Sequence, residues 1–409
     1  MSSRRGKGPA TSDRSQPQPY DPRPAVSVVI PCLNEERTIA HVVAQVKEAI
    51  ADLGVATEVV VADNDSDDSS AAAAAAAGAR VVQVTPRGYG YALQGGISAS
   101  CGRAVVTLDG DGTYHPGDIP SLVAELWKGY DIVIGSRYMG RREKGSMSLR
   151  SRIGNPLLTW LLNVLYGTRL SDTHSGMRAF TRETWERLQL ISGGMEWAPE
   201  MCIKASVLKL RIAEIPIRYL AAPKGRRSHQ RTLRDGWRHL RLLLTYRPEV
   251  SLLAPGLAAA LLAPSLLVLQ MTAELPAATH MAIVAGGSLV ALLGHFALSA
   301  YLVARVFLSA VGLRPWTDQL DRVLRTLTAE RAIVGILMML ALSVTVGAAA
   351  LLKWARGDGG SLEIGLAGLA IATGLVAFQS FLLLFLCSLI GEAAASLQLV
   401  RSFRSEGVD

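Results

Sequence analysis

The chain has 409 residues, of which 50% are apolar and 19% are charged, and its formal net charge at pH 7 is +8. Its mean hydropathy is +0.27 and long uncharged stretches dominate beyond about Val250, so the composition predicts a soluble α/β portion followed by a membrane portion. The arginines gather in clusters and form no long basic tract, which argues against nucleic acid and favours phosphates and anionic lipid surfaces as partners.

The first 24 residues are rich in Ser, Arg, Gly, Pro and Gln and hold hardly any large apolar side chain. Such a segment cannot bury a core, so we expect a disordered, basic N-terminus over residues 1–24. It also lacks the apolar stretch of a secretory signal, which predicts that the domain after it stays in the cytoplasm.

Apolar runs rich in β-branched residues then alternate with helical patterns. This alternation predicts an α/β fold with a mostly parallel sheet and right-handed crossovers. We expect Pro31 to end the first strand, because proline cannot donate a ladder hydrogen bond. The predicted strands are residues 26–30, 58–62, 81–84, 104–108 and 131–135.

Two carboxylates spaced one residue apart, Asp109 and Asp111, follow the fourth predicted strand. Ligands bind beyond the carboxyl ends of strands in open α/β sheets. Mg²⁺ or Mn²⁺ is typically held there by one or two carboxylates together with substrate phosphates. The spacing alone favours a solvated Asp-Gly turn between strand and helix, and the accompanying motifs reverse this interpretation. Asp63 ends the second predicted strand and is likewise placed to meet a ligand.

The stretch 86–96 forms a glycine-rich start to a predicted helix. Such a start can bring backbone amides and a helix N-terminus toward phosphates. The pattern is not a Walker loop, and on its own it does not specify a phosphate site.

Five motifs in a fixed order carry a family resemblance, and together they are highly specific. The chain resembles the family 2 inverting glycosyltransferases of GT-A fold over roughly residues 25–247, and within them the polyprenyl-phosphate sugar transferases such as dolichyl-phosphate mannose or glucose synthases. The resemblance implies a metal-dependent hexosyltransferase that uses Mg²⁺ or Mn²⁺. Its donor is a UDP- or GDP-linked sugar and its acceptor an undecaprenyl- or dolichyl-type phosphate. The motifs lie at residues 26–36, 63–68, 109–111, 135–138 and 172–178.

Carried over residue by residue, the resemblance assigns the donor side of the site. Asp109 and Asp111 resemble the metal-binding pair, and Thr113 occupies a position that sometimes adds a ligand. Two positions depart from the family pattern: Gly110 replaces a bulkier residue, and Asp65 stands beside the predicted base pocket where glycine is usual. The residues implied to bind the nucleotide sugar are Pro31, Leu33, Asn34, Glu35, Asp63, Gly88, Asp109 and Gly110.

The acceptor side is assigned to arginines and one aspartate. A phosphate oxygen is already anionic, so no strong general base is needed, and arginines should hold and orient the phosphate. Arg137 is the first candidate, and Asp111, Arg137 and Asp172 form the predicted catalytic set. The alternative for Asp172 is a turn or cap role. The remaining acceptor candidates are Arg178, Arg150, Arg152, Arg226 and Arg227.

Two segments favour contact with a bilayer surface. A basic loop over 141–152 precedes an apolar helix over 156–166, which the resemblance places near the bilayer; the alternative is a core helix. Residues 224–247 mix arginines with apolar residues at helical spacing, which indicates a basic amphipathic interfacial helix. The alternative there is a solvated helix packed on the catalytic domain. His174 and His115 are expected to orient loops.

Each of four later apolar segments exceeds the roughly 20 residues that cross a bilayer. The connection 274–280 has no Lys or Arg, whereas 314–331 contains several arginines, so the positive-inside rule places both termini in the cytoplasm. We expect His295 to bridge helices as a neutral imidazole. The segments lie near residues 252–273, 281–311, 332–352 and 362–391.

The predicted organisation is a GT-A domain joined to an all-α membrane domain of four helices. Membrane lipids are expected partners, nucleic acid is not, and a homo-oligomer is left open. Two alternative functions remain: a processive polysaccharide synthase with a hydroxyl acceptor, whose Gln-x-x-Arg-Trp motif is absent here, and a non-catalytic lipid-handling module. The predicted parts are an N-terminus over 1–24, a GT-A domain over 25–223, an interfacial helix over 224–250, a membrane domain over 251–395 and a cytoplasmic tail over 396–409.

Overall fold

A computed structural model describes residues 24–223, 232–272, 276–310, 318, 322, 329–357 and 366–386. The chain folds into two compact units. The first unit extends to Asn163 and includes Thr168–Thr232, and the second combines Val164–Gly167 with the chain from Leu233 onward. The predicted N-terminal segment, apart from Pro24, and the predicted tail lie outside the described residues.

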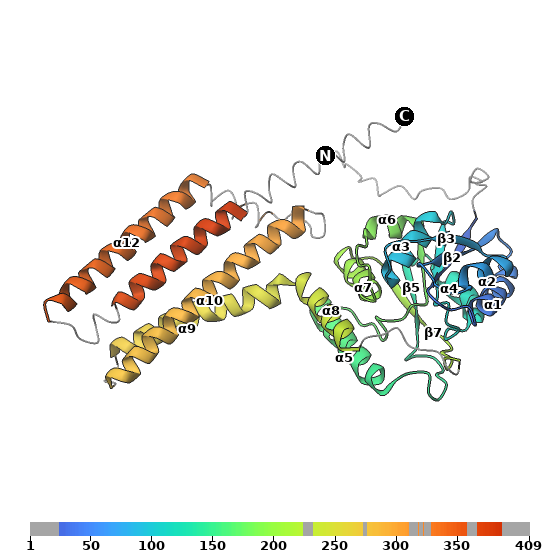
Figure 1. Cartoon of the computed structure of the whole chain (residues 1–409), viewed down its shortest axis with the longest axis horizontal. Helices are drawn as coiled ribbons and strands as arrows, with labels where there is room; N and C mark the ends of the chain where they lie inside the picture. Colours follow the sequence, from blue (N-terminus) through green and yellow to red (C-terminus); the bar gives the residue numbers. More distant parts are fainter. Residues whose placement is uncertain are drawn as a thin grey trace, which may run out of the picture. The chain divides into compact units, whose positions relative to one another are not determined.

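Within residues 24–223, seven strands form one sheet in the order β3-β2-β1-β4-β6-β5-β7 (Figure 1). Neighbouring strands are parallel except that β6 runs antiparallel to both β4 and β5. The predicted α/β fold with a mostly parallel sheet is therefore confirmed, and β6 and β7 are strands that the sequence patterns did not predict. The strands are β1 Val26–Cys32, β2 Thr57–Asp63, β3 Arg80–Gln83, β4 Ala104–Thr107, β5 Ile132–Ser136, β6 Arg178–Thr181 and β7 Ile212–Pro216.

The expectation that Pro31 ends the first strand is wrong. β1 continues to Cys32, which lies in register with Asp63 of β2. Pairing of β1 with β4 stops at Val29, so Pro31 lies beyond the last residue that has a partner in β4. Proline has no amide hydrogen, but no hydrogen bond to β4 is needed at this position. The longer strand carries the following loop to the edge of the sheet where Asp63 lies.

Helices cover both faces of the sheet: α1, α2 and α4 lie on one side and α3, α6 and α7 on the other (Figure 1). Along β1, Val28 packs in the same cluster as Val42 of α1, while a Cβ on Gly96 of α3 would lie 2.6 Å from Cγ1 of Val29. Burial on both faces explains why the strands are continuous apolar runs. The helices are α1 Ile39–Ala51, α2 Ser70–Ala76, α3 Tyr89–Ala99, α4 Ile119–Trp127, α5 Leu149–Tyr166, α6 Arg182–Leu188 and α7 Trp197–Val207, and the 3₁₀ helix η1 is Pro116–Asp118.

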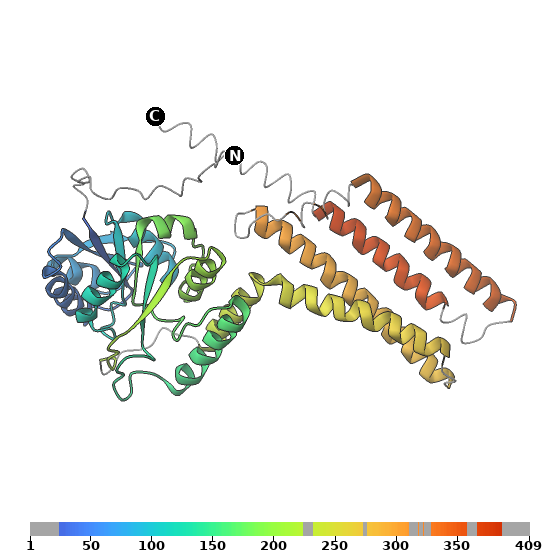
Figure 2. The same ribbon diagram turned by 180° about the vertical axis from the view of Figure 1, so that it is seen from behind.

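The second unit is helical and is drawn from yellow to red in Figure 2. It contains α8 Thr232–Thr245, the π-helical turn η2 Glu249–Leu253, α9 Ala254–Thr272, α10 Ala277–Ala310 and α12 Ala329–Ala355. The part of the predicted interfacial helix over 224–231 lies outside the described residues. Among the residues that the structure describes, four helical stretches are long and apolar enough to cross a membrane: Glu249–Leu266, Ala278–Ser309, Glu330–Ala355 and Leu366–Leu386.

These stretches confirm the four predicted membrane segments by length and composition. His295 of α10 lies in the second of them, and its Nε2 is 3.0 Å from the Ser380 hydroxyl of the fourth. The imidazole therefore joins two apolar helices, as expected for a neutral bridging histidine.

Candidate active site

Three loops meet at the carboxyl edge of the sheet. β1 lies between β2 and β4, and all three strands are parallel, so the loops that follow them lie side by side. These loops carry the Leu33–Glu36 segment, the acidic segment after Asp63, and the Asp109–Thr113 turn. The sheet thus brings together the residues that the sequence predicted to bind a nucleotide sugar.

Asp63 is buried, with 2% of its surface exposed. One carboxylate oxygen, Oδ1, is enclosed and has no hydrogen-bond partner among the described residues, while Oδ2 accepts the Ser66 amide at 3.4 Å. A buried acceptor without a donor costs about 1–3 kcal/mol. The orphaned oxygen therefore fits an N–H donor on a ligand, and the edge of a nucleotide base carries such a donor.

The loop after β1 is tied to the loop after β2. Asn34 donates its amide to Ser66 Oγ at 3.0 Å and accepts the Asp67 amide at 2.8 Å, and the Glu35 amide donates to Ser70 Oγ at 2.8 Å. These contacts hold Pro31, Leu33, Asn34 and Glu35 next to Asp63.

Asp65, where the family usually has glycine, has a φ of 67°. This is the left-handed conformation, which glycine adopts freely and aspartate tolerates better than most residues. Its side chain accepts a hydrogen bond from Arg87 Nε at 2.8 Å. The departure from the family pattern therefore keeps the backbone turn and adds a surface ion pair.

The amides of both glycines at the start of α3 are bonded within the protein. Gly88 donates its amide to Asn64 Oδ1 at 2.5 Å, and Gly90 donates to the Gly193 carbonyl at 3.0 Å. A Cβ on Gly88 would lie only 2.3 Å from that same carbonyl oxygen. The glycines thus allow close packing against the Ser192–Gly193 loop, and the expected phosphate contact of the Gly88 amide is not supported.

The acidic turn after β4 holds two oriented carboxylates. Asp111 is 8% exposed, and its Oδ1 accepts hydrogen bonds from the Thr113 amide at 2.9 Å and the Thr113 hydroxyl at 2.6 Å. Asp109 Oδ1 accepts the Tyr89 hydroxyl at 2.8 Å. Gly110 packs closely, since a Cβ there would lie 3.2 Å from the Pro31 carbonyl oxygen. The two hydrogen bonds from Thr113 orient the Asp111 carboxylate in this structure.

The donor set fits a hard divalent cation that is completed by substrate. Carboxylate oxygens are the ligands that Mg²⁺ and Mn²⁺ prefer. Across the described residues, no group of three or more His, Cys, Asp or Glu side chains is arranged to hold a metal ion. Asp109 and Asp111 would hold the ion together with oxygens from a bound diphosphate.

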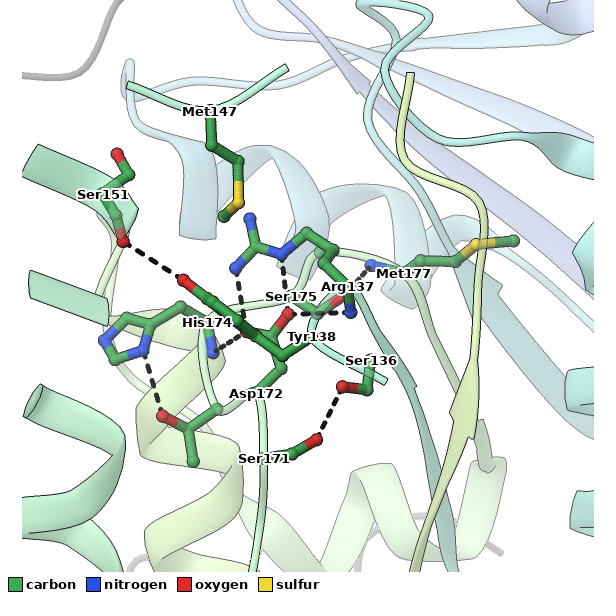
Figure 3. Close-up of polar contacts among 12 residues, drawn as sticks. Ser136, Arg137, Tyr138, Met147, Ser151, Ser171, Asp172, His174, Ser175 and Met177 are labelled. Atoms are coloured by element: carbon green, nitrogen blue, oxygen red, sulfur yellow. Dashed lines mark hydrogen bonds and ion pairs between the residues drawn. The ribbon is translucent and has the colours of Figure 1, made fainter. Parts of the chain in front are cut away.

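Arg137 and Asp172 form a buried ion pair beside this turn (Figure 3). Arg137 Nε donates to Oδ2 of Asp172 at 2.7 Å, and Nη2 donates to Oδ1 at 2.8 Å. Asp172 is fully buried and Arg137 is 6% exposed. Burial alone would raise the pKa of Asp172, but the adjacent Arg137 guanidinium holds that pKa below its ordinary value. Both partners are therefore charged at neutral pH.

Two tyrosines connect this ion pair to the acidic turn, and the sequence analysis did not identify them. The Arg137 guanidinium lies 5.3 Å from the centre of the Tyr219 ring, which packs edge-on against Tyr114 at 5.1 Å. The next residue, Leu220, donates its amide to the Thr113 carbonyl at 2.7 Å. A cation–π contact and one backbone hydrogen bond thus place Arg137 close to the turn that carries Asp111.

The segment that carries Asp172 is supported by Glu214 of β7. Glu214 accepts the amides of Ser171 at 2.7 Å and Asp172 at 3.0 Å. A single acid in a short apolar strand is a weak signal in the sequence, and nothing nearby in the chain reveals its partners. His174 Nδ1 lies 3.0 Å from Thr173 Oγ1, as expected for a loop-orienting histidine (Figure 3).

Of the other predicted acceptor arginines, Arg178 is the one whose contacts the structure gives in full. Arg178 is fully buried and donates to the carbonyls of Thr173, Ser175 and Ala198 at 2.7–2.8 Å. Its donors hold the 172–178 loop against α7, so its predicted phosphate contact is not supported. Arg150 and Arg152 lie in the first turn of α5, and Arg226 and Arg227 lie outside the described residues.

α5 begins at Leu149, well before the expected start at Pro156, and the proline lies inside it. One face of this helix exposes large apolar side chains that recur every three or four residues. They are Leu149, Ile153, Leu157, Trp160 and Val164, which are 58–71% exposed. An unburied apolar stripe of this kind disfavours the core-helix alternative and suits an interfacial helix.

Comparison with known proteins supports the same class. Residues 27–188 match glycosyl transferase family 2, and residues 302–391 match the glycosyltransferase family 2 C-terminal transmembrane region. The chain is 35% identical over 195 residues to the dolichyl-phosphate hexose transferase of Haloferax volcanii, a match that covers 47% of this chain and 82% of that protein.

Two further proteins are similar over part of the chain. The low-salt glycan biosynthesis hexosyltransferase Agl6 of Haloferax volcanii is 40% identical over 238 residues, and the match covers 58% of this chain but only 57% of Agl6. The solved glucosyl-3-phosphoglycerate synthase of Mycobacterium tuberculosis, in complex with Mn²⁺, UDP-glucose and phosphoglyceric acid, has a TM-score of 0.45 and 27% identity, over 54% of this chain and 79% of that one.

An α/β domain with an acidic turn, followed by apolar helices long enough to cross a membrane, is the arrangement of a family 2 glycosyltransferase with a C-terminal transmembrane region. The chain belongs to glycosyl transferase family 2.

Proposed function

We propose that this enzyme transfers a hexose from a UDP- or GDP-linked sugar to a polyprenyl phosphate, with inversion at the anomeric carbon. The observation that carries the proposal is the buried Arg137, which Asp172 holds and Tyr219 connects to the acidic turn. A permanent cation next to a diphosphate-binding turn suits an acceptor that is itself a phosphate. The similarity to a dolichyl-phosphate hexose transferase supports the same acceptor class.

On the donor side, the orphaned Oδ1 of Asp63 accepts a hydrogen bond from the base. Asp109 and Asp111 hold Mg²⁺ or Mn²⁺ together with the diphosphate. When bound, such an ion supplies Lewis-acid stabilisation of the leaving diphosphate. Thr113 keeps the Asp111 carboxylate oriented before the donor arrives.

On the acceptor side, the Arg137 guanidinium uses two different edges for two contacts. Asp172 engages the Nε–Nη2 edge, and the Nη1–Nη2 edge binds the lipid phosphate. The attacking phosphate oxygen needs no deprotonation, so the site requires orientation more than a general base. In-line attack opposite the leaving diphosphate then inverts the anomeric centre.

The proposed reaction takes place at the cytoplasmic surface of the membrane. The exposed apolar stripe of α5 lies in the interface, where the phosphate of a membrane-bound polyprenyl lipid is accessible. Both termini are proposed to lie inside, which the positive-inside rule supports because 314–331 contains several arginines and 274–280 contains none.

Purified full-length protein incubated with Mn²⁺ or Mg²⁺, a panel of UDP- and GDP-hexoses, and undecaprenyl or dolichyl phosphate tests this function. We expect a glycosylated lipid with one donor class and none without metal. Equal glycosylation of a polyprenol that lacks the phosphate favours the hydroxyl-acceptor alternative. Absence of transfer and of donor hydrolysis with every donor favours the non-catalytic alternative.

A further inference from the structure

The first residue of α3, Tyr89, reaches across to the acidic turn after β4. Its hydroxyl donates a hydrogen bond to Asp109 Oδ1 at 2.8 Å. The two residues lie in segments that the sheet brings together from different strand ends. A tyrosine between two glycines thus delivers a side-chain donor, although the sequence of this stretch had suggested backbone donors to a phosphate.

The protein fixes the backbone on both sides of Tyr89. Asn64 accepts the Gly88 amide, and the Gly193 carbonyl accepts the Gly90 amide. The loop that carries Gly193 is held in turn by Glu200, which accepts the Ser192 amide at 2.8 Å. The start of α3 therefore has a fixed position from which the Tyr89 hydroxyl extends.

Gly176 closes the space around this hydrogen bond. A Cβ on Gly176 would lie 2.7 Å from the Tyr89 hydroxyl oxygen and 2.8 Å from Asp109 Oδ1. Its amide donates to the Tyr114 hydroxyl at 2.7 Å, and its carbonyl accepts the Thr107 hydroxyl at 2.8 Å. Gly176 is thus held firmly against the Tyr89–Asp109 pair.

We propose that Tyr89 is a positioning residue for the metal site, because its hydroxyl holds the Asp109 carboxylate in the orientation that binds the ion. This inference rests on the proposed function, which assigns Asp109 to the metal. Partners that orient a ligating carboxylate commonly change metal affinity 10- to 100-fold when they are removed. Through Asn64, next to the base-binding Asp63, the same segment also links the two ends of the donor site.

The test is Mn²⁺ binding to full-length Tyr89→Phe, measured by electron paramagnetic resonance with UDP and, separately, with GDP. We expect roughly tenfold weaker Mn²⁺ binding than in the wild type. Raising Mn²⁺ should restore most of the transfer rate, which a general folding defect would not allow. Tyr91→Phe removes the same group from the same helix, at a side chain that is 39% exposed, and should bind Mn²⁺ like the wild type.

The outcomes separate this inference from the proposed function. If wild-type protein binds no Mn²⁺ with either nucleotide, the assignment of the metal to Asp109 and Asp111 is wrong. If the wild type binds and Tyr89→Phe binds equally well, the positioning role is wrong. Should Tyr89→Phe not be recovered folded, Gly176→Ala replaces it, because the new methyl group would push Tyr89 and Asp109 apart. Wild-type Mn²⁺ affinity in that variant contradicts the inference.

Discussion

Arg137 and Asp172 form a bidentate ion pair that is almost wholly removed from solvent, with nitrogen–oxygen distances of 2.7 and 2.8 Å. Asp172 also accepts the backbone amides of Arg137 at 3.1 Å and His174 at 3.2 Å. Removing two charges from water is compensated only when their remaining hydrogen-bonding groups are satisfied. These added contacts satisfy the carboxylate and fix the plane of the guanidinium, which is what recognition of a phosphate requires.

Arg137→Lys should impair transfer even though it keeps the charge. A lysine ammonium cannot reproduce the planar fork that is proposed to bridge Asp172 and the lipid phosphate. Loss of one charge-assisted hydrogen bond, about 1.5–3 kcal/mol, should lower the rate at limiting acceptor by roughly ten- to a hundredfold. Kinetics measured separately in donor and acceptor check this, with Arg103→Lys, at the opposite edge of the sheet, as the control. An effect confined to the donor KM would assign Arg137 to the donor site.

Asp172→Asn should both inactivate and destabilise the protein. It leaves the buried Arg137 charge without a counter-charge, which typically costs about 3–5 kcal/mol. Because the pKa of Asp172 is lowered on folding, its stabilisation is present above its ordinary value of 3.8 and is lost as the pH falls through the lower folded pKa. Denaturation at pH 7 and near pH 3 should therefore show a gap between wild type and variant that narrows in acid. A gap that is constant with pH would contradict the ion-pair account.

Asp111→Ala should nearly abolish transfer while leaving the fold intact. The variant removes one of the two carboxylates assigned to the metal, and metal ions contribute several kcal/mol of transition-state stabilisation. Initial rates across a Mn²⁺ titration, together with the unfolding midpoint, measure both effects. Asp52→Ala, at the exposed C-terminal end of α1, is the matched control. Metal-dependent turnover near the wild-type rate would rule out the assignment.

The sequence predicted those parts of the fold and site whose signals are local. Strands β1–β5 and the Asp109–Asp111 turn follow from short apolar runs and from motifs that lie next to one another in the chain. β6 was not predicted because its antiparallel place between β4 and β5 depends on pairing with residues far away in the chain. The carboxyl edge of the sheet could nevertheless be inferred, since parallel strands share it.

Side-chain environments were the harder part to infer. An arginine beside glycine and methionine gives no local sign that the Ala198 carbonyl will accept a hydrogen bond from it, so the burial of Arg178 could not be foreseen. Tyr219 and Glu214 act through contacts with residues tens of positions earlier in the chain, and neither belongs to a motif. The glycines around Tyr89 indicate backbone amides that face a phosphate, and they give no sign of the bond between the Tyr89 hydroxyl and Asp109.

The orientation of the membrane domain can be tested with cysteines introduced one at a time at residues 277 and 320, in a protein whose Cys101 and Cys387 are replaced by serine and whose Cys32 and Cys202 are buried. The positive-inside rule predicts that an impermeant maleimide labels residue 277 from outside the cell and labels residue 320 only after the membrane is opened. If residue 320 is labelled from outside and residue 277 only after the membrane is opened, both termini lie outside and the proposed cytoplasmic site is wrong.

The apolar stripe of α5 is proposed to contact the bilayer, and a charge introduced into it tests this contact. Leu157→Asp places a charge on a face that is proposed to lie in the bilayer interface, where burying a leucine contributes roughly 1.5–3 kcal/mol. KM for a long-chain polyprenyl phosphate in vesicles should therefore rise about tenfold or more. Use of a short, water-soluble prenyl phosphate should stay unchanged, because the Arg137 site itself is intact. Trp127→Asp, at a 54% exposed side chain of α4, is the control. If use of both acceptors falls equally, α5 supports the fold. If use of neither acceptor falls, the stripe does not contact the membrane.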